Sequence, residues 1–306
     1  MSFTSERLTL TVFIAMSVLA GGNAVGVRFS NRELDPLWGA GLRFSLAAMV
    51  LLVIMVAMRQ AIPRGKALAG AVLYGLFSFG GAFALTYYGL ERVQAGIGQT
   101  LLAIVPLATL LLAFAQGQER LHSAGVVGTL LAIGGIAVVS GVTAADSIPL
   151  LSMLALVGAA ICFAEAAVLV HRFPSVHPVA LNAIGMTSGA IFLLSAALIA
   201  GNRFALPEKA ATWTAIVFLV FVGSVLVFVL YVFVLQRWAA SRASYTFVLI
   251  PIFTVIFSAW LDDEKIGAGL VVGGLLVLAG VYVGALRPGH VAVKQAHTGP
   301  TDRHTG

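Results

Sequence analysis

The chain has 306 residues, of which 60% are hydrophobic and only 10% are charged, and its mean hydropathy is +1.02. About a quarter of the residues in a soluble globular domain are charged, so this composition excludes a soluble fold with an ordinary polar surface. The formal net charge of +6 requires no nucleic-acid partner, because basic cytoplasmic loops facing an anionic lipid leaflet account for it.

Apolar runs of roughly 20 residues, the length needed to cross the hydrocarbon core of a bilayer, follow one another with short connections. We therefore predict an all-α integral membrane protein with ten transmembrane helices. In chain order the predicted spans cover residues 9–28, 36–58, 67–89, 94–116, 123–142, 150–171, 178–200, 212–236, 241–261 and 266–286. The first run follows Arg7 and could be read as a signal peptide, but the other spans follow it at once. Residues 287–306 are predicted to form a disordered cytoplasmic tail.

Lys and Arg are unevenly divided between the two sides of this arrangement. Eleven fall on the side that carries both termini and six on the other, while Arg43 lies inside a span. Because basic loops remain in the cytoplasm, both termini are predicted to be cytoplasmic. The expected location is the cell inner membrane, with the lipid bilayer around all ten spans.

An internal repeat relates residues 92–141 to residues 237–286, at a displacement of 145 positions. The matched pairs are Arg92 and Arg237, Ala95 and Ala240, Pro106 and Pro251, Thr109 and Thr254, Glu119 and Glu264, Gly128 and Gly273, and Gly135 and Gly280. Each half then holds five spans, an odd number, so the second half must enter the membrane from the opposite side. The sequence predicts two inverted five-helix repeats, residues 1–145 and 146–286. Inverted repeats in a membrane chain are typical of secondary transporters.

The repeated segment also resembles a known pattern. The stretch LERVQAGIGQTLLAIVPLATLLLAFAQGQER, and its counterpart LQRWAASRASYTFVLIPIFTVIFSAWLDDEK, are similar to the fourth-span signature of the drug/metabolite transporter superfamily in its ten-span EamA-type branch. The stretches AGGNAVGVRFS and DPLWGAGLRFSLAA are similar to that family's first and second spans. One departure is Gln118 and Asp263, where the family usually has Gly before the glutamate.

This resemblance implies a carrier of small organic metabolites, often an amino-acid exporter, that works by alternating access without ATP. It also implies a central cavity formed by spans 1, 3, 4, 6, 8 and 9, with the fifth and tenth spans as scaffold. Aromatic or hydrophobic amino acids are the first expectation for the substrate, and a drug, nucleobase or vitamin carrier of the same fold is the alternative. An intramembrane enzyme or a receptor is a remote alternative, since no nucleophile with a base, no metal cluster and no added soluble domain is found in the sequence.

Pro106 and Pro251 lie at the same place in the two copies. A proline inside a helix removes one backbone donor and frees a carbonyl one turn earlier. We interpret both prolines as hinges that kink helices lining a wet cavity, with a static kink as the alternative. Glu119 and Glu264 fall at the membrane interfaces and are interpreted as helix-end residues.

Gln99 and Ser244 are also matched by the repeat, and each lies two turns before its proline. The seven-residue separation places each on the same helix face as the proline. Both are candidates for substrate binding, as is Tyr245 beside Ser244, although hydrogen bonds between helices would explain them equally.

Two charged residues lie inside predicted spans. Glu165 is about 15 residues into the sixth span and is either a site for proton coupling or a substrate amine, or a protonated packing residue. Arg43 lies about 10 Å below the outer end of the second span, from a rise of about 1.5 Å per residue. It could attract a substrate carboxylate, but we favour a structural role in which it extends outward to pair with Glu33 or Asp35.

Three further residues complete the predicted substrate site. Asn23 lies late in the first span, and Ser78 and Phe79 lie in the middle of the third span among glycines. Small residues leave space between helices, and Phe79 would provide an aromatic wall. No cofactor or metal site is expected, because the single cysteine, Cys162, has no cluster of His or Asp near it. The oligomeric state is left open between monomer and homodimer.

Overall fold

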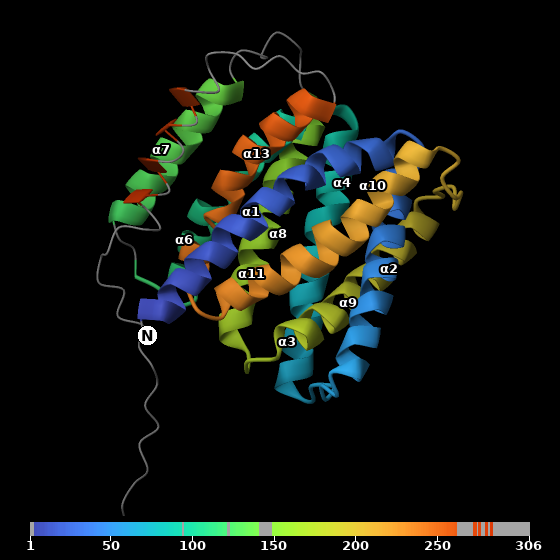
Figure 1. Ribbon diagram of the computed structural model, residues 1–306, viewed down its shortest axis with the longest axis horizontal. Coiled ribbons are helices and arrows are strands. Elements are labelled where there is room, and N and C mark those ends of the chain that lie inside the picture. The colour runs from blue at the N-terminus through green and yellow to red at the C-terminus, as the bar shows by residue number, and fades with distance from the viewer. Residues whose placement is uncertain are drawn as a thin grey trace, which may run out of the picture.

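The computed structural model is helical throughout the part of the chain that it describes (Figure 1). That part comprises residues 3–93, 95–120, 123–140 and 149–261, with isolated positions between 272 and 283. The elements are α1 (Phe3–Asn31), α2 (Pro36–Ala57), α3 (Lys66–Gly75), η1 (Leu76–Gly81), α4 (Ala82–Arg92), α5 (Ala95–Leu102), α6 (Val105–Ala115), α7 (Ser123–Ser140), α8 (Leu150–Arg172), α9 (Pro178–Ile199), α10 (Ala210–Val220), η2 (Phe221–Leu226), α11 (Val227–Leu235), α12 (Ala240–Ala243) and α13 (Thr246–Leu261).

Seven helical stretches within the described ranges are long and apolar enough to cross a membrane, by length and composition. They correspond to the first three predicted spans and to the sixth through ninth. The fourth predicted span is divided into α5 and α6, and the fifth corresponds to α7, which contains the shorter apolar stretch Ser123–Gly135. The predicted tenth span lies largely outside the described residues, as do the boundary between the repeats at residue 145 and the tail from residue 287. The structure thus supports seven of the ten predicted crossings.

α2 and α9 occupy equivalent places in the two halves, and they begin and end alike. Each begins with a proline in its first turn, Pro36 or Pro178, where the missing N–H is not needed. Each is followed by a residue of positive φ, Arg59 at 51° after α2 and Gly201 at 69° after α9. In both, the next amide donates to the carbonyl five positions earlier, which closes the helix end in a Schellman motif.

The two halves interlock instead of folding separately. α1 packs against α10, α11 and α13 of the second half, and α8 packs against α3, α4 and α6 of the first half. α2 packs against α9, and α3 packs on α9 as α10 packs on α2. Each of these helix contacts therefore has a counterpart in which the first and second halves change places. The buried hydrophobic residues of both halves form one shared core. α7 lies at the edge of the bundle in Figure 1.

Polar contacts collect at both ends of the bundle. At one end, which we call the Glu119 end, they join Glu6 to Arg242, Glu119 to Ser241, and Gln116 to Arg172. At the other, the Asp35 end, they join Glu33 to Lys209, Asp35 to the amide of Arg203, and Trp38 to Ala205. α1 runs from the Glu119 end to the Asp35 end, whereas α8 finishes at the Glu119 end. α1 and α8 therefore run in opposite directions.

A π-helical segment interrupts one helix in each half. η1 separates α3 from α4, and η2 separates α10 from α11. Residues 76–81 and 221–226 are related by 145 positions, the displacement of the sequence repeat. π-Helical turns disturb the regular backbone ladder and are frequent at functional sites. The repeat is therefore also present in the helices that contain η1 and η2, although few residues are identical between them.

Candidate substrate site

Arg43 lies on α2, and its side chain is fully buried, with 0% exposed. Its Nε donates to Oγ of Ser224 at 2.8 Å, and its Nη2 donates to the carbonyl of Gly223 at 3.0 Å. Nη2 also donates, over 3.5 Å, to Oδ1 of Asn23, and the Asn23 amide donates to the Gly223 carbonyl at 3.3 Å. The guanidinium therefore joins α1 and α2 of the first half to η2 of the second.

Gly223 is needed at this point because there is no room for a side chain. A Cβ there would lie 2.0 Å from Oδ1 of Asn23 and 3.2 Å from Nη2 of Arg43. Gly223 belongs to η2, and a π-helical turn interrupts the usual ladder of backbone bonds. Its carbonyl is thereby free to accept hydrogen bonds from two side chains.

The expected pairing of Arg43 with a carboxylate near the end of its helix is not found. Glu33 forms an ion pair with Lys209 at 3.8 Å, and Asp35 accepts a hydrogen bond from the amide of Arg203 at 2.7 Å. Among the described residues, no carboxylate is paired with Arg43. Arg43 is held inward by neutral acceptors because these lie within its reach on α1 and η2, so it does not extend outward to the interface.

A cluster of aromatic rings adjoins Arg43. We call it the aromatic core; it consists of Phe44, Phe79, Phe83, Phe163, Phe228, Tyr231 and Phe247. The Arg43 guanidinium carbon lies 4.9 Å from the ring centroids of both Phe44 and Phe83, which is within range of a cation–π interaction. Phe83 and Phe228 are related by the 145-residue displacement, and their centroids are 5.8 Å apart. The aromatic core thus lies where equivalent positions of the two halves meet.

Two of the predicted site residues belong to this region through η1. Phe79 is fully buried, and its ring centroid lies 5.2 Å from that of Phe44 and 4.8 Å from that of Phe228. Ser78 is buried beside it in η1. Gly189 of α9 provides the space, because a Cβ there would lie 2.5 Å from the Cβ of Phe79. Of the predicted set, Asn23 contacts Arg43 directly and Phe79 lies in the adjoining aromatic core.

The other predicted polar residues lie at the broken helices. Gln99 is buried on α5. Ser244 lies between α12 and α13, where its Oγ is 3.0 Å from Oγ1 of Thr109 and donates to the Ala240 carbonyl at 2.7 Å. The Tyr245 hydroxyl instead donates to the carbonyl of Gly125 on α7 at 3.0 Å. The structure therefore does not place Tyr245 and Asn23 in one cluster.

The two prolines have different local structures. Pro106 lies in the first turn of α6, where a proline is well tolerated, and the helix is broken immediately before it. Pro251 lies inside α13, and the break in that span comes earlier, at Ser244 and Tyr245. The predicted kink at Pro106 therefore takes the form of a short turn at Ala103 and Ile104, across which the amide of Ile104 donates to the Leu101 carbonyl.

Glu165 is found near the Glu119 end rather than beside Arg43. Both of its carboxylate oxygens accept hydrogen bonds from Nε2 of Gln116, at 3.1 and 2.9 Å. Arg172 in turn donates to Oε1 of Gln116 at 3.4 Å. The carboxyl group is half-buried and accepts its hydrogen bonds from a neutral amide, so its predicted role in proton coupling, substrate binding or packing stays a prediction.

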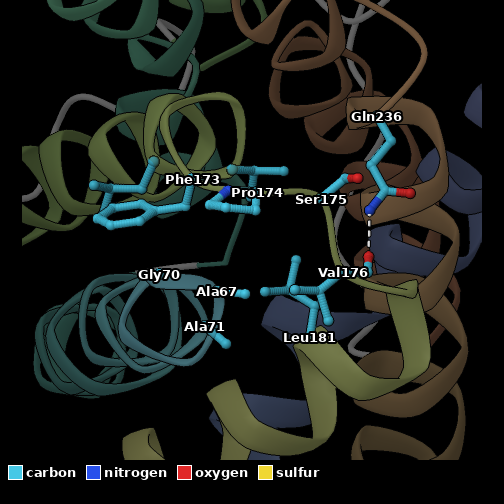
Figure 2. A pocket seen from close by; sticks show the side chains of 11 residues that line it. Ala67, Gly70, Ala71, Phe173, Pro174, Ser175, Val176, Leu181 and Gln236 are labelled. Atoms are coloured by element: carbon cyan, nitrogen blue, oxygen red, sulfur yellow. Dashed lines mark hydrogen bonds between the residues drawn. The ribbon is translucent and has the colours of Figure 1, made fainter. Parts of the chain in front are cut away.

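Two pockets in the described part of the chain lie away from Arg43. The first, shown in Figure 2, lies at the Glu119 end between α3, the end of α8 and the start of α9, and Gln236, which also lines it, donates to the Val176 carbonyl at 2.6 Å. Its lining includes Gly70 and Phe173. The second is an open apolar hollow on the surface of α2. The aromatic core and Arg43 are buried in the packed centre of the bundle.

Sequence reasoning missed the partners of Arg43 and part of the aromatic core. The matched phenylalanines Phe83 and Phe228 could have been found from the 145-residue displacement. Gly223 and Ser224 carried only the weak signal of small residues in the middle of an apolar run. The described part of the chain contains no group of three or more His, Cys, Asp or Glu side chains placed to hold a metal ion.

Comparison with known proteins decides the family. A profile of the EamA-like transporter family matches residues 7–141 and again residues 150–285. The chain belongs to the EamA-like transporter family. This EamA-family protein is accordingly a multi-pass membrane transporter, and the two matches agree with the resemblance that the sequence analysis identified.

Relatives of this EamA-family protein are known from bacteria and archaea. An uncharacterized transporter, YyaM, of Bacillus subtilis is 27% identical over 284 residues, which cover 88% of this chain and 93% of that protein. The uncharacterized inner membrane transporter YedA of Escherichia coli K12 is 25% identical over 283 residues, covering 90% of this chain and 92% of its own. A solved crystal structure matches with a TM-score of 0.76 at 16% identity, covering 92% of this chain and 97% of that chain. At that identity the structural match shows the fold alone.

Proposed function

We propose that this transporter is an alternating-access carrier of small organic metabolites in the cell inner membrane. Export of aromatic or hydrophobic amino acids is its first candidate activity. The observation that carries the proposal is the buried centre in which Arg43 and the aromatic core are enclosed by elements of both halves. A solute held there would be screened from both ends of the bundle.

The arrangement of the halves supports an inverted repeat. α1 and α8 run in opposite directions, and the contacts of one half recur in the other with the partners exchanged. In carriers built from inverted repeats, one set of helices rocks against the other around a site near the midplane. Because neither half has a separate core here, such a motion would reshape the interface on which Phe83 and Phe228 meet.

Broken helices near the centre support the same mechanism. The breaks between α5 and α6 and between α12 and α13 leave backbone groups without their usual helical partners. At membrane depth such groups are tolerated only where they are buried in protein or line a cavity. The hydrogen bond between Ser244 and Thr109 joins the second break to α6. We propose that the helices bend at these two breaks during transport, while the backbone at Pro106 and Pro251 stays rigid.

The Glu119 end is proposed to face the cytoplasm, with both termini on that side. Arg172 and Arg242 lie at this end, and Arg203 and Lys209 lie at the other, as the division of basic residues predicts. Glu165, bound by Gln116 near the same end, is the candidate for proton coupling. A carboxylate that exchanges a proton with the cytoplasm would be suitably placed there.

The test is transport by the purified protein in proteoliposomes. Aromatic and hydrophobic amino acids, a nucleobase, a vitamin and a cationic drug are supplied in turn, with and without a pH gradient. We expect gradient-driven flux of aromatic amino acids. Phe79→Ala should reduce that flux about tenfold, since losing a contact of about 1.4 kcal/mol changes affinity by that factor.

The matched control is Phe114→Ala, because Phe114 is 49% exposed on α6 and lies outside the aromatic core. Glu165→Gln should abolish any dependence of the flux on the pH gradient. Flux of the nucleobase, vitamin or drug alone would replace the amino-acid proposal with one of its alternatives. If no solute moves faster than in empty liposomes, the carrier proposal fails.

A further inference from the structure

The hydrogen bonds of Arg43 leave one side of its guanidinium open. Nε and Nη2 donate to Ser224 and Gly223, and Nη2 makes its longest contact, 3.5 Å, with Asn23. Nη1 has no hydrogen-bond partner among the described residues, and neither has the hydroxyl of Tyr87. That hydroxyl adjoins the guanidinium closely enough to interact with it both by charge and by weak hydrogen bonding. The least occupied side of the guanidinium is therefore the edge between Nη1 and Nη2, where Nη1 has no partner and Nη2 makes only its 3.5 Å contact with Asn23.

The charge of Arg43 is also uncompensated within the described residues. Its acceptors are a hydroxyl, a backbone carbonyl and an amide oxygen, all of them neutral. A cation at membrane depth is costly unless it is paired, and such residues commonly mark substrate pathways. The rings of Phe44 and Phe83 add only the modest attraction of cation–π contacts. An anion bound from outside the protein would supply the negative charge that the residues around Arg43 lack.

The geometry of the free edge selects the kind of anion. Two parallel N–H groups of a guanidinium match the two oxygens of a carboxylate, which makes the bidentate pair both strong and specific. The rings of Phe44 and Phe83 adjoin the guanidinium, so the aromatic core would offer apolar surface to the rest of the solute. We infer that Arg43 binds the carboxylate of the transported solute, and that the substrates are small organic carboxylates with an apolar or aromatic body. This inference rests on the proposed carrier function and assigns the residue that holds the carboxylate of its substrate.

Asn23 takes the place of the carboxylate in the closed structure. Its Oδ1 makes the longest of the contacts to Nη2, and it belongs to α1, whereas Arg43 belongs to α2. When the two helices separate, this contact is the one that the solute replaces. An aspartate at position 23 would therefore act as a tethered competitor for the guanidinium.

The experiment measures binding to the full-length protein in detergent. Ligand binding raises the thermal unfolding midpoint, which is followed by labelling of the single cysteine, Cys162. The probes are phenylacetate, phenethylamine and benzyl alcohol, which share a ring and carry a carboxylate, an ammonium group and a hydroxyl. We expect the wild-type midpoint to rise with phenylacetate alone.

The variants separate anion binding from a structural role. Arg43→Lys keeps the charge but loses the bidentate edge, so we expect about a tenfold weaker affinity for phenylacetate. Asn23→Asp should abolish the response to phenylacetate, because its carboxylate occupies the guanidinium, although the variant loses the hydrogen bond that the Asn23 amide donates to the Gly223 carbonyl. Arg43→Gln should also abolish the response. The control is Arg59→Gln, because Arg59 is exposed beyond the end of α2.

The inference is overturned if phenylacetate causes no shift, or if phenethylamine or benzyl alcohol shifts the wild type equally. It is also overturned if Arg43→Lys and Asn23→Asp both bind phenylacetate as the wild type does. These two variants decide the matter if Arg43→Gln does not fold. Binding through Arg43 without flux of any solute in proteoliposomes would instead remove the carrier proposal. Flux of neutral solutes that Arg43→Lys leaves unchanged would keep the carrier proposal and remove the inference.

Discussion

Replacing Gly75 with alanine should destabilise the crossing of α3 and α9. A Cβ at Gly75 would lie 2.1 Å from the carbonyl oxygen of Gly185, 2.4 Å from its Cα and 2.3 Å from Oγ of Ser188. Ser188 can rotate away, but the two atoms of Gly185 are backbone and move only with α9. The added methyl group therefore forces the two helices apart.

The required displacement sets the magnitude of the effect. Ordinary contact begins at 3.4 Å, so the backbone atoms must separate by about 1.3 Å. Overpacking of this kind costs about 1–3 kcal/mol, and a shift of whole helices puts Gly75→Ala near the upper value. The higher helix propensity of alanine returns at most about 1 kcal/mol. We expect a net loss of about 2 kcal/mol in the free energy of unfolding.

The measurement is the thermal unfolding midpoint in detergent, followed by labelling of Cys162, which is half-buried on α8. The control is Gly134→Ala on α7, because a Cβ at Gly134 meets no atom of the described residues within 4 Å. That variant should be neutral, or more stable by up to about 1 kcal/mol. If Gly75→Ala unfolds at the wild-type temperature, the close packing of α3 on α9 is not what the structure indicates.

Three further predictions concern the ends of the bundle. Arg59→Gly should stabilise the protein by about 1 kcal/mol in the same assay, because Arg59 has a φ of 51° that costs a residue with a Cβ more than it costs glycine; a lower midpoint would contradict this. Glu119→Gln should weaken the packing at the Glu119 end, because the Glu119 carboxylate caps α12. A cysteine placed at the buried position of Thr109 should then react faster with a membrane-impermeant thiol reagent. An unchanged reaction rate would refute this prediction. The hydroxyl of Thr212 holds the pKa of Glu33 below its ordinary value, so the stability that Glu33 contributes is present above the unfolded-state pKa and is lost as the pH falls through the lowered one. Glu33→Gln should therefore flatten the acid side of the plot of unfolding midpoint against pH, and an unaltered profile would count against this.

The sequence predicted the class of protein well but the positions of single polar groups less well. Long apolar runs and few charges suffice to predict membrane helices, because hydrocarbon leaves a chain few other structures. Matched residues at one displacement were enough to identify two related halves, and of the predicted site residues Asn23 contacts Arg43 and Phe79 lies in the aromatic core. The partner of Arg43 was predicted wrongly, because a long side chain can reach several neighbours and only packing selects among them. The break before Pro106 was expected as a kink, since the path of the preceding residues depends on contacts with other helices.

Composition and the spacing of the repeat are enough to predict the membrane environment, the helical class and the presence of two related halves, because all three depend on local hydrophobicity and residue order. Tertiary packing decides how the halves interlock, since α1 and α8 each find their partners in the other half. Packing also places η1 and η2 against a common centre. It buries Arg43 among neutral acceptors there, where the cost of an unpaired charge makes an external carboxylate its natural partner. No spacing in the chain reveals that arrangement, because it depends on which helix faces meet in three dimensions.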